Sequence, residues 1–446
     1  MKKYTKWTIY GLVILILIGI SLIAPIDNTP LEEQLFYQTM MKRLDTLKPI
    51  VHNGTSKTKV GWSKFNITPN YSMPMAGYTP KDKFETIHDS VYCRVLSIDN
   101  GSSFNFIVTA DLMLFPPVIK DKVTEELKRQ KKNYFVHFSA THTHSSLGGW
   151  DKSLVGRIAL GSYHKEWVDK VTQDIILHLE KAISTSLPSS IHYLETDAAE
   201  FVENRLDRTN GKVDGKLRGL KFIREDSSKA MVVTYSGHAT TVGLLNRIIS
   251  GDYPTALTNH LEKNGFDFGM FMAGMVGSHR LKGFDGEEFE RIEKTGQVLS
   301  EKIIKADSQQ LADSFSISSA HIPIKFGASQ LRIANNWKVR DWIFRSSIGK
   351  LQGELTVLQI GNIVLIGTPC DFSGEIFVDE KIDSLASTFG KKVIITSFNG
   401  NYTGYVTADQ YYNKGEEEEV MALNWVGPYF GEYYSDMIRQ ILTSNF

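Results

Sequence analysis

The sequence predicts a mixed α/β or α+β domain built around large β-sheets. Short apolar runs typical of strands recur along the chain, and longer segments with helical periodicity, such as residues 118–132 and 164–184, alternate with them. An apolar content of 42% in 446 residues is sufficient for a large packed core. The predicted strands are residues 91–98, 104–110, 134–138, 220–223, 231–235, 270–273, 355–360, 363–367 and 392–398.

The N-terminus has the pattern of a membrane signal. Lys2, Lys3 and Lys6 precede an uncharged apolar run over residues 7–25, which would cover about 28 Å as a helix and could span a bilayer. We expect residues 1–26 to form an uncleaved anchor with its lysines in the cytoplasm. The alternative is a cleaved signal peptide, although the run ends without a clear small-x-small cleavage site. Either way, the rest of the chain is expected outside the cytoplasm.

The segment after the anchor reads as a helix and a linker, over residues 27–57. Thr29-Pro30-Leu31-Glu32 has the form of a capping box with proline at the first helical position, and it predicts a helix that runs to about residue 47. The main domain is expected over residues 58–446.

Composition argues against a nucleic-acid-binding protein and against a small domain held by disulfides. Lysine plus arginine and aspartate plus glutamate both number 50, so no overall charge favours a nucleic-acid partner. Cys93 and Cys370 are the only cysteines, which excludes a disulfide framework and leaves at most one bridge between them.

Chemically reactive side chains follow several predicted strands. His142 and His144 come after strand 134–138, and an i, i+2 spacing in an extended backbone points both rings to the same side. His238 follows strand 231–235 beside Gly237, and Asp371 follows strand 363–367. Surface histidines in a threonine-rich turn, or a histidine buried in the core, are the alternatives. Two or three histidines and a carboxylate at strand ends fit a catalytic zinc site with an open coordination position.

Several motifs, in this order, resemble the catalytic domain of the neutral ceramidases over about residues 58–435. They are Gly61-x4-Asn66-Ile67-Thr68-Pro69, Met75-Ala76-Gly77-Tyr78, Thr141-His142-Thr143-His144-Ser145 with Gly148-Gly149, His238, Ser250-Gly251-Asp252-Tyr253, Pro369-x-Asp371 and Tyr402-x-x-Tyr405-Val406-Thr407.

The resemblance implies two large β-sheets flanked by helices and a zinc hydrolase that cleaves the amide bond of N-acylsphingosine. By position, it implies that the zinc ligands are His142, His238, Asp371 and Tyr405. His144 would hydrogen-bond to the reacting water or to the developing oxyanion, and Arg205 would line the site. Tyr405 would therefore serve both the metal and the catalysis.

The chain also departs from the family pattern. Asp371 stands where the family usually carries glutamate, and Glu375 is the alternative ligand. Residues 274–280 differ from the family's serine-containing segment, where Ser278 and His279 are possible local substitutes and a plain loop is the alternative.

The sequence thus predicts a membrane-anchored, extracytoplasmic zinc amidase that acts on a small-molecule lipid amide. A metal-dependent esterase on the same scaffold is one alternative. A binding protein without turnover is the other, because a fold alone does not determine activity.

Overall fold

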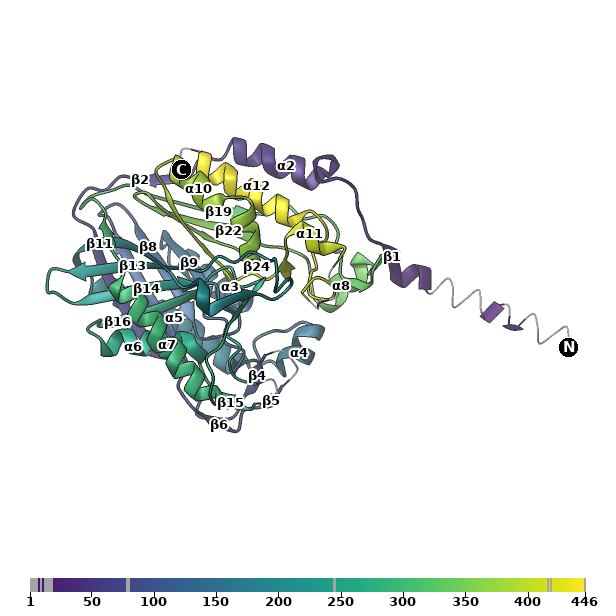
Figure 1. The fold of residues 1–446 in the computed structure, drawn as a ribbon, viewed down its shortest axis with the longest axis horizontal. Helices are drawn as coiled ribbons and strands as arrows, with labels where there is room; N and C mark the ends of the chain where they lie inside the picture. Colours follow the sequence, from purple (N-terminus) through teal and green to yellow (C-terminus); the bar gives the residue numbers. More distant parts are fainter. Residues whose placement is uncertain are drawn as a thin grey trace.

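Two β-sheets lie face to face in the computed structural model, and helices cover the outer face of each (Figure 1). The structure describes residues 7–8, 10–11, 19–77, 81–243, 246–414, 417 and 419–444. The larger sheet has nine strands, ordered β16 (Phe268–Ala273), β14 (Lys229–Tyr235), β13 (Lys216–Arg224), β11 (Leu187–Asp197), β3 (Lys59–Asn66), β7 (Tyr92–Asp99), β8 (Phe104–Ala110) and β9 (Tyr134–Ala140), with β18 (Ser308–Gln310) paired to β11. The smaller sheet has five strands, ordered β2 (Ile50–His52), β19 (Ile317–Pro323), β22 (Glu354–Ile360), β23 (Ile363–Gly367) and β25 (Lys392–Thr396).

Alternating side chains divide the core into layers. In β8, Ile107 faces the smaller sheet, while Phe106 and Val108 face the helices on the outer side. This alternation is the period-2 pattern of a strand that is buried on both faces. The helices on the larger sheet are α3 (Pro117–Arg129), α5 (Lys165–Ser184), α6 (Asp252–Lys263) and α7 (Glu288–Lys305), and those on the smaller sheet are α2 (Leu35–Asp45), α9 (Gly374–Asp379), α10 (Ile382–Thr388) and α12 (Phe430–Thr443).

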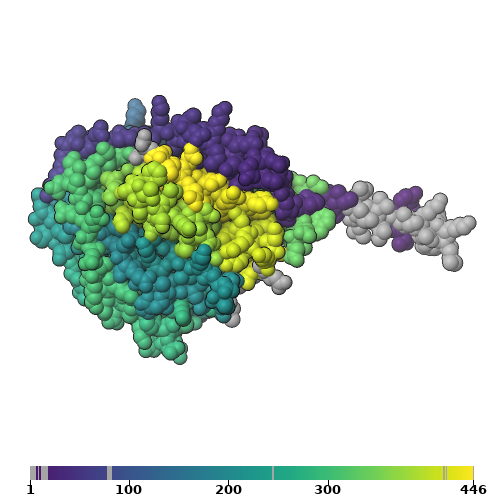
Figure 2. Space-filling view, turned by 45° about the horizontal axis from the view of Figure 1, so that its top comes forward, coloured from purple at the N-terminus to yellow at the C-terminus, as the bar shows by residue number. Residues whose placement is uncertain are grey.

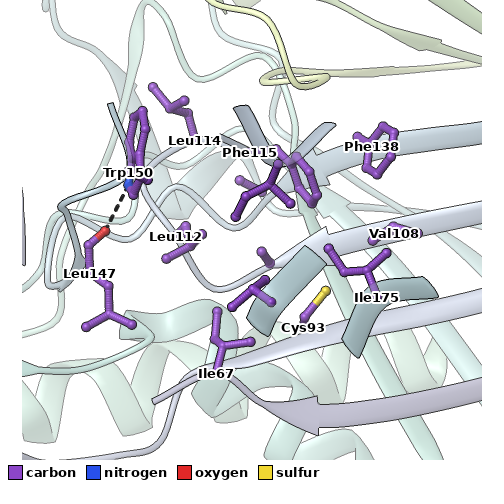
Figure 3. Close-up of a cluster of buried hydrophobic side chains, with 14 of the residues drawn as sticks. Ile67, Cys93, Val108, Leu112, Leu114, Phe115, Phe138, Leu147, Trp150 and Ile175 are labelled. Carbon is purple, nitrogen blue, oxygen red and sulfur yellow. Dashed lines mark hydrogen bonds between the residues drawn. The ribbon is translucent and has the colours of Figure 1, made fainter. Parts of the chain in front are cut away.

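One apolar cluster lies between α3, α5 and the larger sheet and extends toward the loops that follow β8 and β9 (Figure 3). Phe115 and Phe138 pack with ring centroids 4.5 Å apart. Trp150 is buried beside them and satisfies its indole N–H by donating to the carbonyl of Leu147. Cys93 belongs to this cluster and, like Cys370, is buried and free, so the possible disulfide is not formed.

Short elements complete the chain. They are β1 (Ile23–Pro25), η1 (Leu31–Glu33), β4 (Pro74–Ala76), β5 (Lys81–Lys83), β6 (Thr86–Ile87), β10 (Ser146–Leu147), α4 (Leu154–Leu160), η2 (Ala199–Phe201), β12 (Val202–Asn204), β15 (Ile248–Ile249), β17 (His279–Leu281), β20 (Arg332–Ala334), β21 (Trp337–Val339), α8 (Asp341–Ser347), β24 (Asp371–Phe372), β26 (Tyr405–Val406) and α11 (Asp409–Tyr412).

The prediction of a mixed α/β fold with large sheets is confirmed, and β8 and β23 have the predicted bounds. The predicted capping box is wrong. Thr29 instead directs its hydroxyl and its backbone N–H to the carboxylate of Asp27, and only a short 3₁₀ turn follows before α2 begins at Leu35. An aspartate two residues before the threonine competes for the same side chain.

Much of the predicted membrane anchor, including residues 12–18, lies outside the described residues. Among the helices that the structure describes, none is both long and apolar enough to cross a membrane. The predicted boundary at residue 26 also needs adjustment, because β1 pairs with β21 and Ile26 is buried in the body.

Candidate metal centre

Three histidine side chains converge where the strands of the larger sheet end. The Nε2 atoms of His142 and His238 are 2.8 Å apart, and Nε2 of His144 lies 3.1 Å from the first and 3.0 Å from the second. All three side chains are buried. Together they form a group that could hold a metal ion.

Hydrogen bonds from two of these rings determine which ring nitrogen carries the lone pair. His142 donates from Nδ1 to the carbonyl of Met113, and His238 donates from Nδ1 to the carbonyl of Val276 at 3.3 Å. A carbonyl only accepts, so in each neutral ring the single proton lies on Nδ1 and Nε2 carries a lone pair. Two lone pairs that face each other at 2.8 Å repel unless a cation lies between them.

The spacing fits a metal of the size of zinc. Two nitrogen ligands of a tetrahedral zinc ion lie about 3.3 Å apart, given zinc to nitrogen distances of about 2.0–2.1 Å. The distances found here are only a few tenths of an ångström shorter. Burial also lowers the pKa of His142 to about 3 and that of His238 well below its usual value, so both rings stay neutral, as ligands must be.

Asp371 brings a carboxylate to the same place. Its Oδ1 lies 3.3 Å from Nε2 of His142, and its Oδ2 accepts a hydrogen bond of 2.8 Å from the hydroxyl of Tyr402. Within the described part of the chain, Oδ1 is buried and accepts no hydrogen bond. Burial raises the pKa of Asp371 to about 7, against the opposing effects of the Tyr402 hydrogen bond and the charge of Arg205. A buried carboxylate oxygen without a donor, beside an imidazole lone pair, is suited to a cation.

Glu375, the alternative carboxylate, is fully engaged elsewhere. Its Oε2 accepts from the side-chain amide of Asn204 at 2.6 Å. Its Oε1 accepts from the hydroxyl of Tyr411 at 2.9 Å, the amide of Gln410 at 3.1 Å and the backbone N–H of Lys212 at 3.3 Å. These four donors leave the carboxylate no role beside the histidines, and Asp371 is the carboxylate that the structure brings to them.

Tyr405 and Arg205 lie beside this group. Tyr405 is opposite Asp371 in the parallel pairing of β24 with β26, and burial raises its pKa well above the usual value. The Arg205 guanidinium lies 5.2 Å from the centroid of the Tyr405 ring. It donates to the carbonyl of Gly277 and forms an ion pair of 3.0 Å with Glu419. The structure therefore brings together all the predicted site residues.

The two histidines of the i, i+2 pair do not converge for the predicted reason. β9 ends at Ala140, and His142 has a φ of 64°, in the left-handed region, rather than an extended backbone. That local turn places the ring of His142 between His144 and Phe398, whose ring stacks on it at 4.2 Å. The sequence predicted only that both histidines follow the end of a strand.

The tetrapeptide Ser250-Gly251-Asp252-Tyr253 clamps both histidine loops. The Asp252 carboxylate accepts from the backbone N–H of Thr241, and the Tyr253 hydroxyl donates to the carbonyl of Gly237, on either side of His238. The Ser250 carbonyl accepts from the hydroxyl of Thr143, next to His144. In the sequence this tetrapeptide contributes only to the resemblance, and no local pattern predicts its role.

Ser278 and His279 lie behind the centre and not in it. His279 is buried, its Nε2 accepts from the backbone N–H of Asp214 at 2.8 Å, and its Nδ1 lies 2.9 Å from the Ser278 hydroxyl. The Ser278 carbonyl accepts from the backbone N–H of Arg205. The pair therefore supports the Arg205 segment.

Comparisons with known proteins show similarity to the neutral ceramidases. The sequence profile of the N-terminal part of neutral/alkaline non-lysosomal ceramidases matches residues 59–268. The neutral ceramidase of Pseudomonas aeruginosa is 22% identical over 232 residues, which are 47% of this chain and 35% of that protein. The neutral ceramidase of Drosophila pseudoobscura pseudoobscura is 24% identical over 215 residues, which are 44% of this chain and 30% of that protein. The matched part thus spans about a third of each relative.

Solved structures share the fold. The crystal structure of the Pseudomonas aeruginosa neutral ceramidase matches with a TM-score of 0.75 at 17% identity, covering 87% of this chain and 74% of that one. A ceramidase complexed with C2 matches with a TM-score of 0.70 at 16% identity, covering 86% and 74%. Residues 59–268 thus match the N-terminal part of the neutral/alkaline non-lysosomal ceramidases in sequence, and the solved structures show the same fold.

Proposed function

We propose that the chain is a zinc-dependent hydrolase of linear amide bonds, with an N-acylated lipid of the ceramide type as its substrate. The observation that carries the proposal is the pair of Nε2 lone pairs of His142 and His238, which face each other at 2.8 Å beside an unsatisfied oxygen of Asp371. The names of the curated relatives, both neutral ceramidases, support the substrate class.

The proposed zinc ligands are His142, His238, Asp371 and Tyr405. The first three are supported by the distances from His142 to His238 and to Asp371, and Tyr405 by its place opposite Asp371 in the β24–β26 pairing. A second set exchanges Tyr405 for His144, because Nε2 of His144 is as close to the other two nitrogens as a ligand would be. The two sets predict different zinc contents for variants of these two residues.

A bound zinc ion acts as a Lewis acid that polarises a carbonyl oxygen and makes water a stronger nucleophile at neutral pH. The charge of Arg205, held beside Tyr405 by Glu419 and Gly277, stabilises the negative charge that develops on the amide oxygen. In this proposal, His144 holds a proton at Nε2 and delivers it to the leaving amine. The buried surroundings of these groups strengthen each electrostatic interaction.

We further propose that residues 1–22 hold the body at a membrane, with the metal centre outside the cytoplasm. The support is the cationic flank followed by the apolar run in the sequence. If so, the full chain stays in the membrane fraction after a high-salt wash, because salt screens charges without weakening apolar insertion. Mature protein that begins near residue 25 in native cells would instead show a cleaved signal peptide.

A substrate panel tests the proposed activity. The purified full chain, loaded with zinc, is offered matched N-acyl and O-acyl lipids with the same acyl chain, and released fatty acid is measured. Amide turnover that stops with a chelator and returns with zinc is the expected result. Turnover of esters only would assign the site to an esterase, and no turnover of either by zinc-loaded protein would favour a binding protein.

A further inference from the structure

The small sheet beside the N-terminal segment has its polar and apolar faces reversed. In the pairing of β20 with β21, Arg332 and Lys338 lie opposite each other and turn toward the body, where they are 5% and 8% exposed. Ile333 and Trp337 turn outward and are 55% and 46% exposed. A sheet with one face in water ordinarily shows the opposite arrangement, with its apolar side chains inside. The outer face is therefore suited to apolar surroundings.

Further apolar side chains extend this face. Trp342 of α8 is 56% exposed, and its indole N–H donates to the carbonyl of Ser21 at 3.1 Å, so the exposed part of the ring is apolar. Ile20 and Leu22 are 57% and 39% exposed beside it. We call this set the docking patch; its residues are Ile20, Leu22, Ile333, Trp337 and Trp342. Adjacent exposed apolar side chains of this size mark interaction surfaces.

The docking patch is fixed to the point where the N-terminal segment leaves the body. β1 pairs with β21, placing Pro25 opposite Trp337, and Arg340 donates to the carbonyls of Ile20 and Leu22. Figure 2 shows the light green residues around α8 against the dark purple N-terminal segment. In the sequence, the residues before this point are an apolar run with a lysine-rich start. A bilayer that takes up that run would lie next to the patch.

We propose that the docking patch rests on the surface of a lipid bilayer and fixes the orientation of the body on the membrane. Tryptophan is suited to this role because its amphipathic ring favours the membrane–water interface. The exposed isoleucine and leucine side chains add apolar area that gains free energy when it leaves water. The proposal rests on the membrane attachment proposed above and concerns only the orientation of the body, so it holds whether or not the metal centre hydrolyses amides.

Environment-sensitive labels test this orientation. The full chain is reconstituted into phosphatidylcholine vesicles after Ile333→Cys, Trp342→Cys or, as the control, Leu177→Cys, each labelled with a nitrobenzoxadiazole fluorophore. Leu177 is 61% exposed on α5, away from the patch, and the native cysteines are buried and escape labelling. Ile333 is decisive, because β20 is the strand of its sheet that does not pair with β1.

We expect the labels at positions 333 and 342 to emit at shorter wavelength in vesicles and to be quenched by spin-labelled lipids, while the label at 177 is unaffected. A label at 333 that behaves like the one at 177 would overturn the proposal, because the body would then only be tethered. A wavelength shift that follows protein concentration at constant lipid would also overturn it, in favour of a second copy of the chain. Trp337→Cys, at another exposed position, repeats the test if either labelled variant is unstable.

Discussion

Replacing Asp371 and Glu375 by their amides distinguishes the two candidate carboxylate ligands. Asp371→Asn removes the charge 3.3 Å from Nε2 of His142 and leaves the shape of the side chain almost unchanged. Loss of an outer-shell partner of a metal already costs 10–100-fold in affinity, so loss of a direct ligand should weaken zinc binding by more than about 100-fold.

Glu375→Gln should act on stability instead. Its two oxygens accept hydrogen bonds from four donors, so the amide group of glutamine must face at least one donor in either orientation. The less harmful orientation loses only the bond from Asn204, whose own oxygen is held by two backbone N–H groups and resists a flip. Leaving a buried donor unsatisfied costs about 1–3 kcal/mol of folding free energy. Zinc affinity should change by less than about tenfold.

Two measurements on each variant decide between the carboxylates. Zinc affinity is measured by competition with a chelating dye, and stability by urea unfolding of the metal-free protein. Glu375→Gln losing zinc while Asp371→Asn keeps it would refute the assignment and the alignment through Pro369 on which it rests.

Three further variants test other parts of the account. His144→Ala should keep zinc while kcat falls about 100-fold, as expected when a proton-transfer group is lost. Tyr405→Phe should lose both zinc and turnover. Loss of zinc from His144→Ala together with retention by Tyr405→Phe would show that His144 is the ligand. Tyr253→Phe removes the hydroxyl that holds the carbonyl of Gly237 and should weaken zinc binding 10–100-fold, measured by dye competition, with unchanged affinity speaking against the clamp. The pKa of buried His137 is lowered to about 3 by desolvation, so its contribution to stability is full above the unfolded pKa of about 6.5 and is lost as pH falls toward 3. His137→Gln should therefore reduce the slope of the unfolding free energy against pH, in metal-free protein, by about 1.4 kcal/mol per pH unit between about pH 4 and 6. An unchanged slope would show that burial does not lower the pKa of His137.

The strands of the core could be predicted because their signal is local. β8 and β23 are continuous apolar runs bounded by polar or turn residues, and their predicted bounds match. The residues that follow such strands could therefore be predicted as well, and His142, His238 and Asp371 are among them. β9 pairs with β8 in the larger sheet and β23 pairs with β25 in the smaller sheet, so the meeting of Asp371 with His142 depends on how the two sheets stack, which the sequence does not contain.

Other features depend on contacts that no local pattern contains. The convergence of His144 with the other rings depends on the left-handed backbone of His142, which is stabilised by its loop and is unusual for a residue other than glycine. The Tyr253 hydroxyl joins two separate segments of the chain by donating a hydrogen bond to the carbonyl of Gly237. The prediction of a capping box was wrong because the Thr29 hydroxyl donates to Asp27. Asp27 lies outside the tetrapeptide on which that prediction rested.

Zinc content of the purified full chain, compared with that of His238→Ala, tests the central claim most directly. His238 contributes one of the two lone pairs that face each other at 2.8 Å, and its removal leaves a cavity without a new charge. We predict about one zinc ion per wild-type chain and none retained by the folded variant after dialysis, with amide turnover lost in parallel. Stoichiometric zinc in His238→Ala, or amide turnover by wild-type protein that a chelator leaves intact, would contradict the assignment of these histidines to a catalytic metal centre.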